Sequence, residues 1–337
     1  ENYGHWGFPG EFLQYGGQSD AVAGEVWNEV QPGSWDLGPL EVKAAASAAH
    51  IYGKKKVSVE AFTAKLRQFE RYPALLKKRG DFAFATGAND FVLHVYISQL
   101  DDERAPGVNA WFGTAFNRKN IWFPHAKGFT DYLRRNMHML QQGNPVSDVA
   151  YFIGESAPAM TGIEQPRLPK GYAYDFINAE VLIDRITVKN GDLVLPEGTR
   201  YRMLVLPPLE TMRPQVLARI SDLVNQGATI FGPAPSSSPS LQNYPASDVK
   251  VKTLANKLWG DVDGKNKTYQ PFGKGHVYDG ENLNEALAGL GMKADFSYDV
   301  KLPVLYNHRQ TDTKDIYFIS NQSDKPLSFT PTFRVKG

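Results

Sequence analysis

Two glutamates, Glu25 and Glu60, stand at the ends of two short, mostly apolar runs, 19–25 and 56–60, with a helix-like segment between them. Parallel strands joined by a helix bring their carboxyl ends to one rim, so both carboxylates would face a common pocket. Hydrolysis of a glycosidic bond uses such a pair: one carboxyl protonates the leaving oxygen, and the other attacks the anomeric carbon or activates water. Glu1 could end the preceding strand in the same way. A solvated loop acid is the alternative for each glutamate taken alone, but their equivalent positions favour a shared site.

Further polar residues follow in the next unit of the pattern. His94 lies in a third strand-like run, 91–96, where it could bind a sugar hydroxyl or a metal, or be a satisfied strand histidine. Asn117 and Arg118 lie in the loop region after that run, and their side chains could bind vicinal hydroxyl groups. Trp122 could stack on the flat face of a sugar ring. A structural loop is the alternative for these last three residues.

The elements around these residues alternate between strands and helices. An alanine-rich helix is predicted over 40–52, and a second over 63–78, where Pro73 should kink or split it. This alternation predicts a parallel sheet with right-handed crossovers, and polar residues at successive strand ends are typical of a (β/α)₈ barrel. Only about three or four such units fit into 1–145. This part is therefore predicted to be the C-terminal half of a barrel, with the missing half upstream.

A second α/β pattern occupies 146–300 and predicts a doubly wound sheet of flavodoxin or glutamine-amidotransferase type. Its predicted strands are 148–154, 203–207, 228–232 and 275–278, and its predicted helices are 176–185, 214–225, 254–259 and 283–290. The amidotransferase reaction needs a cysteine nucleophile, and the chain has no cysteine, so that activity is excluded. In 301–337, the strands 315–321 and 332–335 follow without a helix between them, which predicts the start of a β-sandwich.

Composition narrows the classes of partner. The chain has 337 residues and a net charge of +1, and no basic cluster indicates a nucleic-acid partner. No apolar run approaches the roughly 20 residues that span a bilayer, so no membrane partner is expected. The lack of cysteine excludes disulfides, thiolate zinc sites and cysteine nucleophiles.

Several segments match, in order, those of one enzyme family. They are ENYG (1–4), GEVW (24–27), KAAASAAHIYG (43–53), VEAFT (59–63), FNRKNIW (116–122), DVAYFIGE (148–155), GYAYDFINAE (171–180) and TFRV (332–335). Through these segments the sequence resembles glycoside hydrolase family 106, the α-L-rhamnosidases, along essentially the whole chain.

The resemblance implies an inverting hydrolase that removes terminal α-linked rhamnose from plant polysaccharides or glycosides, with a calcium ion near the substrate. It implies that 1–145 carries barrel strands five to eight, and that Glu60, on strand seven, is the general base. The general acid would lie on strand four, upstream of Glu1. Glu25, the second catalytic candidate, and Glu1 would then contact the sugar or the calcium ion, and the resemblance leaves the metal ligands open.

The resemblance also implies a partner and a setting. Without the upstream half of the barrel as its partner, this chain is expected to be inactive by itself. The parent protein is expected to act in the periplasm of a bacterium or outside the cell. Two alternatives stay open. One is a related barrel glycosidase of the β-galactosidase type, and the other is a carbohydrate-binding module whose carboxylates bind sugar without cleaving it.

Overall fold

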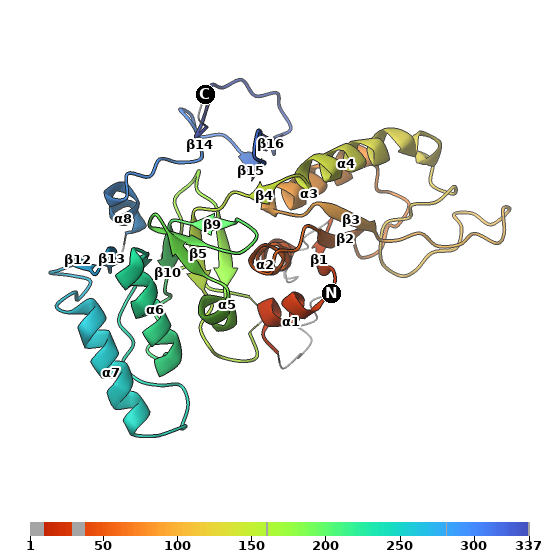
Figure 1. Cartoon of the computed structure of the whole chain (residues 1–337). Coiled ribbons are helices and arrows are strands. Elements are labelled where there is room, and N and C mark those ends of the chain that lie inside the picture. Colours follow the sequence, from red (N-terminus) through yellow and green to blue (C-terminus); the bar gives the residue numbers. More distant parts are fainter. Residues whose placement is uncertain (1–9, 29–37, 160, 281, 336–337) are drawn as a thin grey trace.

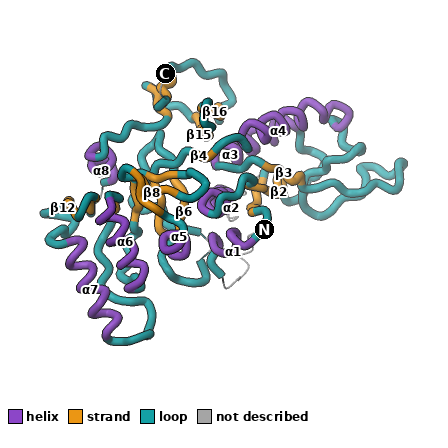
Figure 2. The backbone as a smooth tube through the Cα atoms, viewed as in Figure 1, coloured by secondary structure: helices purple, strands orange, loops and turns teal. Residues whose placement is uncertain are grey.

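The computed structural model describes residues 10–28, 38–159, 161–280 and 282–335. Figure 1 shows a small sheet at the right (β1 to β3), a larger sheet in the centre and the C-terminal strands above them. Figure 2 shows the same view by element type, with long loops that project beyond β3. The mixed α/β fold with parallel sheets, which the sequence predicts, is confirmed. Among the described residues, no helix is long and apolar enough to cross a bilayer.

The first sheet has three parallel strands in the order β1-β2-β3. Helix α2 joins β1 to β2, and α3 joins β2 to β3, which is the predicted alternation. The elements of this part are α1 (Phe12–Gln18), β1 (Val22–Trp27), α2 (Gly38–Ile51), β2 (Val57–Thr63), α3 (Pro73–Thr86), β3 (Asp90–Leu93), the 3₁₀ helix η2 (Phe123–His125) and α4 (Ala126–Leu140).

The two faces of this sheet differ in burial. Along β1, Gly24 and Val26 are buried, whereas Glu25 and Trp27 are partly exposed. The buried side faces α2, because a Cβ on Gly24 would lie 2.9 Å from the backbone oxygen of Glu41. Side chains from α2, α3 and α4 form one buried core with this side of β1 and β2. The face that carries Glu25 is therefore the more open one.

The close approach of β1 to α2 gives a stability prediction. Gly24→Ala is expected to destabilise the protein by about 1–3 kcal/mol, because the added methyl group must push β1 away from α2. Gly128 is the matched control, since it is exposed on α4 and nothing lies within 4 Å of a Cβ added there. Gly128→Ala should stabilise by about 0.5–1 kcal/mol through helix propensity. Urea denaturation measures both changes, and equal midpoints would contradict the close packing.

The limits predicted for the helix over 63–78 are wrong. α3 begins at Pro73 and continues to Thr86. Proline has no backbone N–H, so it suits the first turn of a helix, where that group has no helical partner, better than the interior. The helix continues through Gly80, which leaves room for the ring of Phe62: a Cβ there would lie 3.2 Å from that ring. Gly87, with a φ of 122°, ends the helix instead.

The second sheet has six strands in the order β12-β13-β11-β10-β5-β6, and every neighbouring pair is parallel except β12 with β13. Numbered along the chain, its parallel strands lie in the order 2-1-3-4-5. The elements are β5 (Val149–Phe152), β6 (Tyr174–Ile177), α5 (Ala179–Asp184), β7 (Thr187–Lys189), β8 (Asp192–Val194), β9 (Arg200–Tyr201), β10 (Met203–Val205), α6 (Pro214–Gln226), β11 (Thr229–Phe231), α7 (Ala246–Trp259), β12 (Tyr269–Phe272), β13 (Gly275–Tyr278) and α8 (Leu283–Gly289). Strands β7 to β9 form a separate small antiparallel sheet.

Part of the helix predicted over 176–185 is a strand. β6 ends at Ile177, and α5 begins at Ala179. Asn178 separates the two elements, because its side-chain oxygen accepts a hydrogen bond from the backbone N–H of Val181 at 3.1 Å and caps α5. Helix α7 is also longer than the predicted 254–259.

The last strands are antiparallel, and two of them overlap the predicted strands 315–321 and 332–335. β14 (Phe296–Tyr298) pairs with β17 (Pro331–Phe333), and β15 (Val304–Gln310) pairs with β16 (Asp315–Asn321). β15 also pairs with β4 (Asn144–Pro145), which lies between the two parallel sheets along the chain. The C-terminal strands therefore return to the junction of these sheets.

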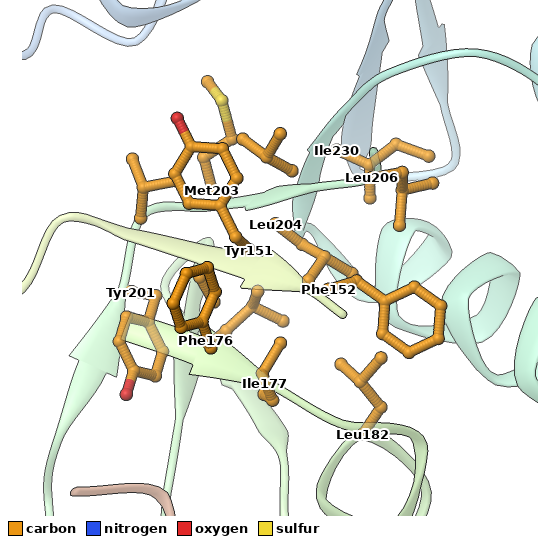
Figure 3. Packing of buried hydrophobic residues seen from close by; sticks show 14 of the residues in the cluster. Tyr151, Phe152, Phe176, Ile177, Leu182, Tyr201, Met203, Leu204, Leu206 and Ile230 are labelled. Atoms are coloured by element: carbon orange, nitrogen blue, oxygen red, sulfur yellow. The ribbon is translucent and has the colours of Figure 1, made fainter. Parts of the chain in front are cut away.

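Helix α2 packs on both parallel sheets. Its Ala48 and Ile51 belong to the same buried core as Tyr151 and Phe176 of the second sheet. Figure 3 shows Tyr151 and Phe176 within this core. Val42, on the same helix, belongs instead to the core behind β1 and β2. The two sheets are thus joined through one helix.

A buried carboxylate adds a polar link at this junction. Asp175 of β6 accepts hydrogen bonds from His50 Nδ1 at 2.9 Å, from the Ser147 hydroxyl at 2.9 Å and from the Tyr201 hydroxyl at 3.1 Å, and Lys43 Nζ lies 3.4 Å away. Burial alone would raise the pKa of the Asp175 carboxyl, yet His50, Lys43 and Ser147 together hold that pKa below its ordinary value. Burial lowers the pKa of the His50 imidazole, against the opposing charge of Asp175. A neutral His50 still donates its Nδ1 proton, so donors surround the buried charge.

Candidate active site

Strands β1 and β2 place Glu25 and Glu60 side by side. The two residues are direct partners in the parallel register, and neighbouring strands lie about 4.8 Å apart. Partners in a parallel pair point to the same face, so both carboxylates lie on the more open face of the sheet. The strands continue to Trp27 and Thr63, so the glutamates lie inside their strands rather than at the ends.

The Glu25 carboxylate and backbone are both held. The indole N–H of Trp27 donates to Glu25 Oε2 at 2.7 Å. The backbone N–H of Glu25 donates to Oε2 of Glu41 at 3.1 Å, and Glu41 is a buried residue in the first turn of α2. Helix α2 therefore fixes the position of the Glu25 backbone.

The Glu60 carboxylate has one close donor. The Thr63 hydroxyl donates to Glu60 Oε1 at 2.8 Å, and Nδ1 of His94 lies 4.0 Å from the same oxygen. The side chains of Glu60 and His94 are 27% and 19% exposed, so both are open to a small ligand without being freely solvated. His94 directly follows the last residue of β3 and thus completes the group.

Aromatic residues pack against His94. The ring of Phe112 stacks on the imidazole, with centroids 4.9 Å apart and planes 29° apart. Gly113 has a φ of 100°, and a Cβ there would lie 2.8 Å from His94 Nδ1. Only glycine fits this position, because both the backbone conformation and the space exclude a side chain. Trp111 lies against Phe112 with centroids 4.2 Å apart and is 69% exposed.

An apolar strand residue is left uncovered on the same face. Val92 of β3 is the register partner of Glu60 and is 59% exposed. Beside them, the Ser58 hydroxyl donates to Asp90 Oδ2 at 2.7 Å. β1 and β3 are both edge strands of the described sheet. The open face thus carries both carboxylates and an apolar side chain that is largely exposed.

The structure brings Glu25, Glu60 and His94 together, but not the loop residues of the same prediction. Those loop residues have other partners. Asn117 is buried and accepts a hydrogen bond from the backbone N–H of Lys119. Arg118 forms an ion pair with Asp102, and the Trp122 indole donates to the backbone oxygen of Arg71. Within the described ranges, no hydrogen bond or ion pair joins Asn117, Arg118 or Trp122 to Glu60 or His94. Glu1 lies outside the described residues.

Sequence reasoning missed three residues that hold the site. Trp27 and Thr63 lie in the matched segments GEVW and VEAFT, so each could have been found from its distance to a glutamate two or three positions away. Glu41 gives no such signal, because its contact with Glu25 depends on how α2 packs on β1.

The described residues alone do not fit a calcium site. Glu25 and Glu60 could contribute carboxylate oxygens, which calcium prefers. Calcium takes about six to eight oxygen ligands. In the part of the chain that the structure describes, no three His, Asp or Glu side chains gather as they would around a metal.

Comparison with known proteins places the chain in a family. The chain matches the model of glycoside hydrolase family 106, described as alpha-L-rhamnosidase, over residues 1–337. A putative beta-glucuronidase of Formosa agariphila is 38% identical over 333 residues, which cover 98% of this chain and 27% of that protein.

Solved structures give a second comparison. A rhamnosidase from Novosphingobium sp. PP1Y is 30% identical with a TM-score of 0.88, and the match covers 96% of this chain and 31% of that one. A GH42 beta-galactosidase from G. stearothermophilus is 12% identical with a TM-score of 0.57, covering 93% of this chain and 55% of that one, which is a likeness of fold alone. The chain spans less than a third of the first two relatives. Because the family model matches the chain from end to end, the chain belongs to glycoside hydrolase family 106, the alpha-L-rhamnosidase family.

Proposed function

We propose that the parent protein hydrolyses terminal α-L-rhamnosyl linkages in plant polysaccharides or glycosides with inversion of configuration. The proposal concerns the parent, because the chain spans only 27% and 31% of two relatives. The observation that carries it is the pair of carboxylates, Glu25 and Glu60, in register on one open face beside His94. Glycoside hydrolysis requires two carboxyl groups. Glu60 would be one of them, with Glu25 beside it as a binding group, and the second catalytic carboxyl would come from the upstream part of the parent. Family membership supplies the sugar.

Glu60 is the proposed general base. Its Oε1 accepts from Thr63, and no donor reaches its Oε2 within the described ranges, so Oε2 is available to a water molecule. Oε2 of Glu25 already accepts a hydrogen bond from the indole of Trp27. A carboxylate held in this way suits the binding of sugar or calcium. The general acid would come from the upstream half of the barrel and protonate the leaving oxygen. An inverting enzyme needs about 6.5–9.5 Å between these two carboxyl groups.

The proposed architecture is half a (β/α)₈ barrel, a flavodoxin-like domain and the start of a β-sandwich, with limits near 145 and 300. The exposed Val92 and the outer edges of β1 and β3, which pair with no further strand among the described residues, support a missing half of the first sheet. The order 2-1-3-4-5 is the flavodoxin-like order of parallel strands. The antiparallel pairing of β14 with β17 and of β15 with β16 is compatible with a sandwich.

Calcium stays part of the proposal as a ligand of the parent. Glu25 is the described residue best placed to contribute to it, and Glu1 and upstream residues would have to supply the remaining oxygens. Bound calcium would supply a fixed positive charge that orients sugar hydroxyls. The steps assigned to Glu60 do not depend on it.

A panel of aryl glycosides tests the proposal on the full-length parent. We expect release of the aryl group from an α-L-rhamnoside, and little from a β-D-galactoside or a β-D-glucuronide. The galactoside tests the alternative of a β-galactosidase-like enzyme, and the glucuronide tests the activity named for the Formosa agariphila relative. Calorimetry that detects rhamnoside binding without product would favour the non-catalytic binding module instead.

A further inference from the structure

His94 carries a buried nitrogen without a hydrogen bond. Its Nδ1 is shielded from solvent and has no hydrogen-bond partner among the described residues. Such atoms are rare in folded proteins because burial without a partner costs free energy, and they often mark functional sites. Within the same residues, the one charged group within 4.0 Å of this nitrogen is Oε1 of Glu60.

Contacts on one face of the ring and on both sides of the backbone limit how the His94 imidazole can turn. Phe112 stacks on one face of the ring. The backbone of His94 is fixed on both sides, since its N–H donates to Ala61 at 2.8 Å and its carbonyl accepts from Thr114 at 3.0 Å. The backbone of Gly113 closes the space beside Nδ1. The loop after β3 thus returns to contact His94, whose Nδ1 lies 4.0 Å from Oε1 of Glu60.

We propose that His94 is a positioning residue that donates its Nδ1 proton to Oε1 of Glu60 when substrate closes the site. This inference rests on the proposed function. Thr63 already donates to the same oxygen, so Oε1 would have two donors and Oε2 alone would accept the proton from the attacking water. The 4.0 Å separation is compatible with this role, because catalytic hydrogen bonds are often long without ligand and tighten in the complex.

The charges around Glu60 favour a hydrogen-bond donor beside its Oε1. Glu60 has the carboxylate of Glu25 beside it on β1 and the imidazole of His94 after β3, while its partner on β3 is the apolar Val92. Two neighbouring carboxylates repel each other when both are ionised. An N–H aimed at Oε1 would offset part of that repulsion.

Three substitutions in the full-length parent test the role of His94 with an aryl α-L-rhamnoside. Asparagine can place an N–H donor near the position of Nδ1, whereas glutamine moves it outward and alanine removes it. We expect H94A and H94Q to lower kcat by roughly 10- to 100-fold with little change in KM. In both variants the acid limb of the pH profile of kcat/KM should move to higher pH. H94N should recover most of kcat and the original acid limb.

Several outcomes would overturn the inference. A raised KM with unchanged kcat would make His94 a sugar contact instead. Equal losses in H94N and H94A, or an acid limb that stays in place in H94A, would remove the donor role. Thermal melting of each variant separates misfolding from lost chemistry, and His125→Gln, at an exposed histidine, should leave activity unchanged. An intact parent that releases no rhamnose would overturn the proposed function itself, and the role of His94 with it.

Discussion

Glu60→Gln in the full-length parent is expected to lower turnover of an aryl α-L-rhamnoside by roughly 10²- to 10⁴-fold. The amide keeps the size of the side chain and can still accept from the Thr63 hydroxyl, so the local structure should persist. It cannot take a proton from water, and the attacking water would lose its base. Initial rates at saturating substrate measure the effect, and circular dichroism verifies the fold.

A matched control isolates the effect of position. Glu70 is exposed, forms an ion pair with Arg67 at 3.1 Å and has no part in the roles assigned to Glu60, so Glu70→Gln should leave turnover unchanged. Near-normal turnover in Glu60→Gln would end the assignment of Glu60 as the base. Proton NMR of the first product adds an independent reading: an inverting enzyme releases rhamnose of the opposite anomeric configuration to the substrate, and retention would place Glu60 in a different mechanism.

The sequence predicts the neighbourhood of the site better than its contacts. Glu25 and Glu60 occupy equivalent positions in successive strand–helix units, and parallel pairing then makes them partners. The sequence predicts His94 inside a strand over 91–96, whereas β3 ends at Leu93 and His94 directly follows it. The contacts of Phe112 and Gly113 with His94 depend on a loop that turns back to the strand end, and no local pattern encodes that return.

The errors in the fold have local causes. Pro73 fits the first turn of a helix as well as a kink, and only the packing of Gly80 against Phe62 shows that the helix continues. The segment that ends at Ile177 is a short strand, because it pairs with β5, and Asn178 begins a new helix. Periodicity over so few residues does not separate a short strand from the first turn of a helix.

Helix α2 contributes side chains to both hydrophobic cores, so a domain boundary near residue 145 does not separate the two cores. Ile51 packs with the second sheet, and Val42 packs behind the first. At the start of the helix, Glu41 holds the backbone of Glu25. Near its end, His50 donates to the buried Asp175. One helix therefore connects the candidate active site with the polar network of the second sheet.

Asp175→Ala is expected to lower the free energy of unfolding by about 3–5 kcal/mol. The substitution removes the acceptor shared by His50, Ser147 and Tyr201, and no solvent reaches this place to replace it. Asp175→Asn should cost less, because the amide oxygen still accepts from some of these donors. Urea denaturation of the whole chain, followed by circular dichroism, measures both changes.

An exposed aspartate and hydrogen exchange complete this test. Asp222 is exposed on α6, so Asp222→Ala should stay within about 0.5 kcal/mol of the unsubstituted chain. Equal effects at Asp175 and Asp222 would contradict a stabilising network at the junction. Because α2 packs on both sheets, Asp175→Ala should also speed amide exchange in β2 as well as in β6. Faster exchange in β6 alone would mean that the first sheet, with Glu25 and Glu60, keeps its structure without the link through α2.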